Sequence, residues 1–320
     1  MALIRNYGTL ACFFALVLLF WVLLPGTFMS GRNLLNISQQ VSMLAVTAIA
    51  MTIVMAMGDY DLSSGSMASL AGVVAAVVFR ETGSDGASLV LALALGIAGG
   101  LLNGFLVSYV GILPFVATLG TLTIFSGLAF LLAGGKTIFG SDIPQSFGAF
   151  ARGGVPLWHD GNAVIVLPNL TIVAILTLLV VWFILQRMVF GRHLRAIGGS
   201  SEAARLAGID VKRTRLIAFA LAGLGAAAAG LMYMSRVASA NPTQGAGLML
   251  DAIAAVFLGM TMHAHGEPRV VNTLVGVLFL GVLSNGLTQL SVDSYVRDIL
   301  VGSIIILAVA ASGLEKLQRN

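Results

Sequence analysis

Apolar runs of about 20 residues recur along this chain, and they constrain its fold more than any other feature. Only 9% of the residues are charged, whereas a soluble domain carries about 25%. Lipid offers the backbone no hydrogen-bonding partners, so a spanning segment must be a helix or part of a closed barrel. The runs are long and unbroken rather than alternating, which favours helices. We therefore predict an all-α, polytopic transmembrane bundle.

We expect eight to ten spans, with ten favoured, within a single transmembrane domain that covers residues 1–320. Two polar breaks interrupt the apolar pattern, GDYDLSSGS at 58–66 and VFLGMTMHAHGEPR at 256–269. We interpret them as interrupted helices of the kind that line cavities in transport proteins. The expected spans are residues 8–24, 41–57, 64–80, 88–110, 115–133, 169–187, 216–233, 250–264, 270–290 and 295–312.

The distribution of cations predicts the orientation. Cytoplasmic loops of membrane proteins carry an excess of Lys and Arg, and the densest basic cluster lies within 188–215. Placing this loop in the cytoplasm puts both termini there and makes 134–168 an extracytoplasmic loop. The same bias accounts for the net charge of +4, so we expect the lipid bilayer as a partner and no nucleic acid.

Enzyme and metal motifs fail on inspection. In AGGKT (133–137), Phe130 stands where a phosphate-binding loop needs glycine. The single Cys12 cannot form an internal disulfide, and His263 and His265 are best interpreted as solvated loop residues. We expect no catalytic residue, no metal site and no cofactor bound by this chain. A membrane-embedded enzyme would need convergent His, Asp or Glu near one membrane face, and the sequence offers none.

Small residues inside the spans indicate where helices pack closely, and polar residues inside them indicate candidate functional positions. Gly96, Gly100 and Gly104 form a ladder typical of close helix packing, within the chain in preference to between subunits. Asp61 and Ser63 either cap the next helix or line a cavity. Buried amides either join helices or face a polar route that binds hydroxylated cargo. The candidates for the substrate pathway are Asp61, Ser64, Asn103 and Asn285.

The segment SEAARLAG in the basic loop reads as a short docking helix. Gly198–Gly199 free the backbone, Ser200 or Ser201 caps the helix, Glu202 lies in its first turn and Gly208 ends it. A helix of about two turns is unstable alone in water. We therefore expect its apolar residues to dock on this protein's own membrane domain or on a separate cytoplasmic protein.

At this loop the sequence becomes similar to a known family. FGRHLRAIGGSSEAARLAGIDVKRTR resembles the cytoplasmic loop of the ribose-type permeases, the monosaccharide branch of bacterial ABC importers. DLSSGS, ILPFVATLGTLTIFSGLA, LDAIAAVFLG, NGLTQL and ILVGSIIILAV agree in the expected order. The chain departs from the family at Met57–Tyr60, where Asp59 adds an acid in place of a glycine pair.

The resemblance implies an inner-membrane permease that pairs with an identical or paralogous subunit. Cytoplasmic ATP-binding subunits would hold ATP and Mg, and a periplasmic sugar-binding protein would deliver the cargo. The loop 188–215 would then be the coupling loop. The coupling surface on the ATPase would comprise Glu202, Ala203, Ala204, Arg205, Leu206, Ala207, Gly208 and Ile209. An ion-coupled secondary transporter of a small polar solute is the alternative, although no span carries the ladder of ionisable residues that a coupling ion needs.

Overall fold

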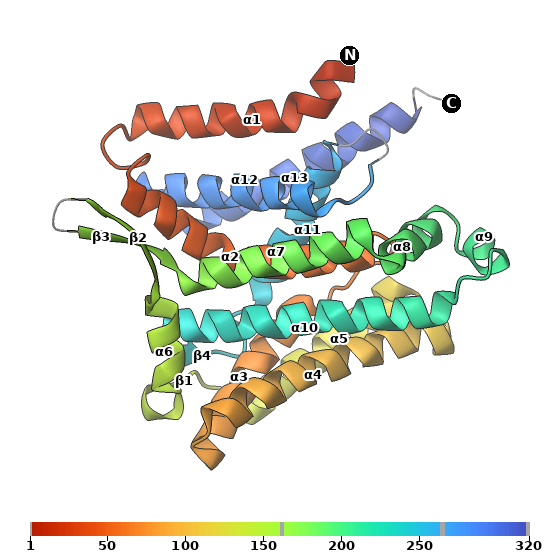
Figure 1. The fold of residues 1–320 in the computed structure, drawn as a ribbon, viewed down its shortest axis with the longest axis horizontal. Coiled ribbons are helices and arrows are strands. Elements are labelled where there is room, and N and C mark those ends of the chain that lie inside the picture. Colours follow the sequence, from red (N-terminus) through yellow and green to blue (C-terminus); the bar gives the residue numbers. More distant parts are fainter. Residues whose placement is uncertain (1, 161–162, 263–265, 318–320) are drawn as a thin grey trace.

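The structure is a computed structural model that describes residues 2–160, 163–262 and 266–317. It is a bundle of long helices with small strand pairs at one end (Figure 1). A helix coincides with each expected span. These helices are α1 (Ala2–Leu23), α2 (Gly31–Met55), α3 (Ser64–Thr82), α4 (Asp85–Phe105), α5 (Pro114–Ala133), α7 (Asn169–Arg187), α10 (Val211–Val237), α11 (Ala246–Met260), α12 (Val270–Gln289) and α13 (Ser294–Leu317).

The membrane character of the fold is confirmed. Within the described residues, six helices are long and apolar enough to cross a bilayer: α2, α4 with its π-helical extension Leu106–Val110, α5, α7, α10 and α12. Residues 8–23 of α1 and all of α11 are shorter apolar helices. The two polar segments each join consecutive helices, since α2 ends at Met55 and α3 begins at Ser64, and α11 ends at Met260 and α12 begins at Val270; that they interrupt a helix to line a cavity stays a prediction. His263 and His265 lie outside the described residues.

The crossing of α4 and α10 uses the predicted glycine ladder. A Cβ on Gly100 would lie 2.2 Å from the carbonyl oxygen of Phe219, and one on Gly223 would lie 2.2 Å from that of Gly96. Such separations are far below van der Waals contact, so only glycine permits this approach of the two backbones. The prediction that the ladder packs within the chain is confirmed.

Two more glycines of α10 face other helices. Gly225 lies against Ala50 of α2, and Gly230 lies against the carbonyl oxygen of Ala68 in α3. The small residues of GLGAAAAG therefore let α10 approach α2, α3 and α4 at once. This explains why the middle of α10, where small apolar residues lie on every face, is placed inside the bundle.

The two long loops lie at opposite ends of the bundle (Figure 1). At one end are the hairpin β2 (Gly154–Asp160) and β3 (Ala163–Pro168), α6 (Gln145–Arg152), and the pair β1 (Ile138–Phe139) and β4 (Ser239–Ala240). At the other end are α8 (Val189–Gly199) and α9 (Ser201–Leu206). The segment 134–168, expected only as a loop, thus contains a folded hairpin and helix.

Candidate functional site

A polar cavity of ≈ 240 Å³ lies between α2, α10, α11, α12 and α13. Gln40 lies about 14 Å along α2 from Gly31, at about 1.5 Å per residue. On α2 the cavity is therefore away from the helix ends, whereas on α10, α11 and α13 it lies at a helix end, beside Arg236, Gly247 and Arg297. The polar residues that line it are Gln40, Tyr233, Arg236, Gln244, Asp251, Ser284 and Arg297.

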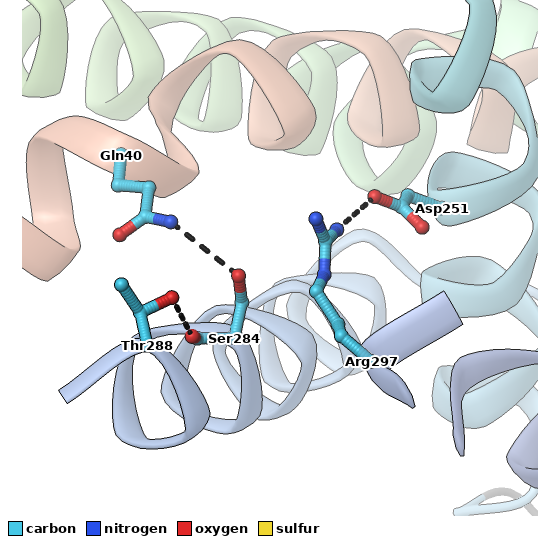
Figure 2. A network of polar contacts seen from close by, with 5 residues as sticks. All are labelled: Gln40, Asp251, Ser284, Thr288 and Arg297. Carbon is cyan, nitrogen blue, oxygen red and sulfur yellow. Dashed lines mark hydrogen bonds and ion pairs between the residues drawn. The ribbon is translucent and has the colours of Figure 1, made fainter. Parts of the chain in front are cut away.

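An ion pair and a chain of weaker contacts organise this cavity (Figure 2). Arg297 donates from Nη2 to Asp251 Oδ2 at 2.7 Å, which joins α13 to α11. The amide of Gln40 donates to the Ser284 hydroxyl at 3.5 Å, at the limit of a hydrogen bond. Among the described residues, Arg297 Nε is buried without a hydrogen-bond partner. The cavity thus holds one tight contact, one loose contact and one unused donor.

A second hollow, a groove of ≈ 840 Å³, lies nearer the hairpin end. It is bounded by the α1–α2 turn, the beginning of α2, strand β3 and Gln289 at the end of α12. Asn33 and Asn285 exchange amide hydrogen bonds of 3.1 and 3.2 Å, and Gln289 donates to Asn285 at 2.8 Å. This amide cluster joins α2 to α12, so the arrangement favours the helix-joining role for Asn285.

Asp61, Ser64 and Asn103 lie together in a separate buried network. The backbone N–H and the hydroxyl of Ser63 both donate to Asp61 Oδ1, at 2.9 and 2.6 Å. Asn103 donates to the Ser63 hydroxyl at 2.8 Å and accepts from Thr121 at 2.7 Å. The network therefore ties the start of α3 to α4 and α5.

This network differs in detail from the predicted cap. Ser63 occupies the N-cap position of α3 but forms no side-chain cap bond; its hydroxyl is turned back toward Asp61. Burial raises the pKa of Asp61, against the opposing effect of the two hydrogen bonds from Ser63. None of Asp61, Ser64 and Asn103 lines either hollow. Their assignment to the substrate pathway stays a prediction.

The short helix α9 forms as its cap residues predict. Ser200 accepts from the backbone N–H of Ala203 at 3.2 Å, and Gly208 ends the turn with φ of 84°. Of the predicted coupling surface only Ala204 is buried, while Leu206 is 78% exposed. The helix therefore holds to its own protein through one small side chain and presents its largest apolar side chain to the outside.

The glycine pair before α9 has a different role from the predicted one. Gly198 and Gly199 complete the helix α8, so they do not loosen the chain. A Cβ on Gly198 would lie 2.5 Å from the carbonyl oxygen of Ala56. Glycine is therefore needed here for the close approach of α8 to the end of α2.

An ion pair makes a second attachment at the same place. Arg215, near the start of α10, donates from Nε to Asp59 Oδ2 at 2.7 Å. Burial raises the pKa of Asp59, and the guanidinium of Arg215 opposes this shift. Through this pair and Gly198, the segment 188–215 is fixed to the turn between α2 and α3.

Comparison with known proteins decides among the function classes. Residues 33–309 match the family described as "Branched-chain amino acid transport system / permease component". The chain belongs to this permease family. It is therefore a multi-pass membrane protein of the bacterial inner (plasma) membrane, and family membership implies ATP-binding and substrate-binding partners. No solved structure matches the chain.

Several sugar permeases are similar to this permease over most of their length. The "Ribose import permease protein RbsC" of Bacillus subtilis (strain 168) is 36% identical over 312 residues, which cover 95% of this chain and 92% of the relative. The "D-allose transport system permease protein AlsC" of Escherichia coli (strain K12) is 31% identical, with 97% and 92% covered. The "Galactose/methyl galactoside import permease protein MglC" of Haemophilus influenzae (strain ATCC 51907 / DSM 11121 / KW20 / Rd) is 33% identical, with 97% and 95% covered.

Sequence reasoning missed the residues of the polar cavity. Asp251 carried a usable signal, since it is a lone acid that opens the apolar run LDAIAAVFLG, and ionisable residues within spans are costly and usually functional. Gln40 and Ser284 carried none, because uncharged polar residues also occur in helices that only pack against one another. Within the described residues no group of three His, Cys, Asp or Glu is placed to hold a metal ion.

Proposed function

We propose that this permease imports a monosaccharide or a similar small polyol, driven by ATP hydrolysis on a separate subunit. Two permeases, identical or paralogous, form the membrane unit, and the cargo passes between them. A periplasmic binding protein delivers the sugar. This chain binds no cofactor of its own; ATP and Mg stay with the ATPase. The sugar relatives support the substrate class, although the family description names amino acids.

The position of α9 and the exposure of its largest apolar side chain support the coupling proposal. It projects from the end of the bundle opposite the hairpin (Figure 1), and Leu206 on it is 78% exposed. An apolar side chain so exposed, on a helix too short to stand alone, is typical of a docking element. The ATPase dimer pushes this element as it closes. Gly198 and the Asp59–Arg215 pair then pass the movement to α2, α3 and α10.

The same arrangement supports the proposed topology of ten spans with both termini in the cytoplasm. The hairpin and α9 lie at opposite ends of helices that are long enough to span a bilayer. The start of α1 and the end of α13 lie toward the α9 end (Figure 1). The segment 134–168 is accordingly extracytoplasmic and 188–215 cytoplasmic.

A co-purification experiment tests the coupling role. In cells that express the complete importer, Leu206→Glu places a charge on the exposed face of α9 and should abolish association with the ATPase. The amount of permease inserted in the membrane should stay at the wild-type level. The matched control is Leu157→Glu, which changes an exposed leucine (47%) on the hairpin at the other end. It should leave ATPase association intact.

Two results would refute this proposal. Normal sugar uptake by Leu206→Glu would show that α9 does not couple the ATPase to transport. Uptake by the purified permease alone in vesicles with an imposed ion gradient would identify a secondary transporter instead.

A further inference from the structure

We propose that the exposed surface where the end of α4 meets the start of α10 binds an anionic phospholipid of the surrounding bilayer. This surface consists of Phe105 and Tyr109, at the end of α4 and on its π-helical extension, and of Lys212 and Arg213 on α10. Both helix ends lie toward α9 (Figure 1). The inference goes beyond the proposed function, since it does not depend on which cargo the permease carries.

The surface lies at the depth of the lipid headgroups. Helix α4 and its extension together comprise 26 residues, so they are about 39 Å long. The hydrocarbon core of a bilayer is about 30 Å thick, and the whole bilayer about 40–45 Å. Tyr109 is one residue from the end of the extension and therefore lies near the boundary of the hydrocarbon, where tyrosine is enriched in membrane proteins.

A lysine from one helix lies over an aromatic ring of the other. The ammonium of Lys212 is 5.4 Å from the centre of the Tyr109 ring, within the range of a cation–π interaction. The Tyr109 ring is stacked on that of Phe105, with ring centroids 5.6 Å apart. Leu216, one turn after Lys212, packs on Gly104, where a Cβ would lie 2.8 Å from the Leu216 Cα. The close crossing of the two helices therefore holds the lysine beside the rings.

The charge of this surface is positive. Lys212 and Arg213 are exposed, and neither forms an ion pair among the described residues. Asp210 is the nearest acid in the sequence, and its carboxylate accepts from the backbone N–H of Arg213 at 3.0 Å. Arg215 is paired with Asp59. One negative charge at Asp210 thus stands against two cations, and a headgroup with a net negative charge would balance the second.

An apolar stripe on α4 leads away from the cations. Ile97, Leu101, Phe105 and Tyr109 follow one another at intervals of four residues, so they lie along one face of the helix. All four side chains are at least 38% exposed. The stripe is about 18 Å long, which is close to one leaflet of a hydrocarbon core about 30 Å thick. It therefore offers an acyl chain a continuous contact directly below the headgroup.

An anionic headgroup suits this surface better than a zwitterionic one. Both kinds carry a phosphate that the Lys212 ammonium can bind. A zwitterionic headgroup also carries an ammonium of its own, which Lys212 and Arg213 repel, whereas phosphatidylglycerol has none. A lipid bound in this way holds the start of α10 at the membrane surface, where the segment that contains α9 joins the bundle.

Native mass spectrometry of the full-length permease in detergent tests the site. The probes are phosphatidylglycerol and phosphatidylcholine with the same acyl chains, and the wild type should bind phosphatidylglycerol with the lower Kd. Lys212→Gln should raise this Kd about fivefold, the effect of one basic residue at a membrane surface. It should change the Kd for phosphatidylcholine less. Lys212→Arg keeps the charge and should retain most of the wild-type affinity.

The matched control is Arg192→Gln, which removes an exposed cation from α8 at the same end of the bundle. It should keep the wild-type Kd for phosphatidylglycerol. Equal losses of affinity in Lys212→Gln and Arg192→Gln would show that the basic segment attracts lipid diffusely and that no site exists. An unchanged Kd in Lys212→Gln would overturn the proposal as well.

The ATPase is the competing occupant of this surface, because it approaches the same end of the bundle. In the complete importer, Lys212→Gln should leave co-purification of the ATPase at the wild-type level. Loss of the ATPase together with an unchanged Kd for phosphatidylglycerol would assign the two cations to the ATPase and refute the lipid site. Neither lipid measurement involves sugar uptake, so failure of the lipid site would leave the proposed function standing.

Discussion

At the residue scale, Asn103 shows how one amide holds three segments of a membrane protein together. Its side chain donates to Ser63 and accepts from Thr121, and it is 1% exposed. Asn103→Leu removes both bonds and should lower the stability by about 1–3 kcal/mol. Thermal unfolding in detergent measures this as a lower midpoint, while the KM for the sugar should stay unchanged.

Thr123→Val is the control for this measurement. Thr123 is exposed on α5 and donates only to the carbonyl of Leu119 in its own helix. Its replacement should leave the midpoint within error of the wild type. A raised KM in Asn103→Leu with an unchanged midpoint would instead place Asn103 on the substrate pathway.

The Asp59–Arg215 pair is the other prediction at this scale. Asp59→Ala frees the start of α10 from the turn before α3, so ATP hydrolysis should continue while less sugar moves for each ATP consumed. The measurement is the ratio of sugar transported to ATP hydrolysed in proteoliposomes. We expect this ratio to fall severalfold and to recover in part when the charges are exchanged, Asp59→Arg with Arg215→Asp.

The chain offers a matched ion pair as the control. Arg80 and Glu81 are 3.2 Å apart, but their side chains are 45% and 66% exposed and neighbours in sequence. Such pairs contribute little, so Glu81→Ala should leave the transport ratio unchanged. An unchanged ratio in Asp59→Ala as well would remove the pair from the coupling route.

At the element scale, the α4–α10 crossing depends on glycine. Gly100→Leu would place its Cβ 2.2 Å from the Phe219 carbonyl oxygen, so the helices must separate. Overpacking of this kind costs about 1–3 kcal/mol or more. The yield of folded permease on size-exclusion chromatography should fall. Gly120→Leu on α5, where no atom lies within 4 Å, should retain the wild-type yield.

The helices could be predicted wherever a pattern of neighbouring residues in the sequence is enough to indicate them. Each span is a continuous apolar run, and α9 follows from Ser200 and Gly208, which act within a few residues. The hairpin was missed although its signal is local as well. The β-branched residues of AVIVLP follow Gly161-Asn162, a dipeptide favoured in two-residue hairpin turns, but the high apolar content of the whole chain hides this local pattern.

The polar cavity could not be predicted because the residues that line it are far apart in the sequence. Its walls bring together Gln40 of α2 and Arg297 of α13, which the sequence separates by most of the chain. Nothing near either residue indicates the other. Asn103 and Asn285 were recognisable as buried amides, but the choice between joining helices and binding cargo required their partners, Ser63 and Asn33.

At the scale of the whole molecule, the proposed function requires α6 and α9 on opposite sides of the membrane. Site-directed labelling tests this in a Cys12→Ser background, in which each introduced cysteine is the only thiol. Ser146→Cys on α6 and Glu202→Cys on α9 both change exposed residues. A membrane-impermeant maleimide should label Ser146→Cys in intact spheroplasts and Glu202→Cys only in inverted vesicles. A protease site after Asn320 should be cut only in inverted vesicles.

Each labelling result bears on a separate part of the topology. An odd number of spans after residue 215 would expose the protease site in spheroplasts while leaving the labelling of the two cysteines as expected. Labelling of both cysteines from one side would mean that the helices between them do not carry the chain across. The ATPase could not then reach α9 while the binding protein reaches the hairpin. The coupling mechanism needs these two contacts at opposite ends of one rigid bundle, since only then does movement at α9 change access at the other surface.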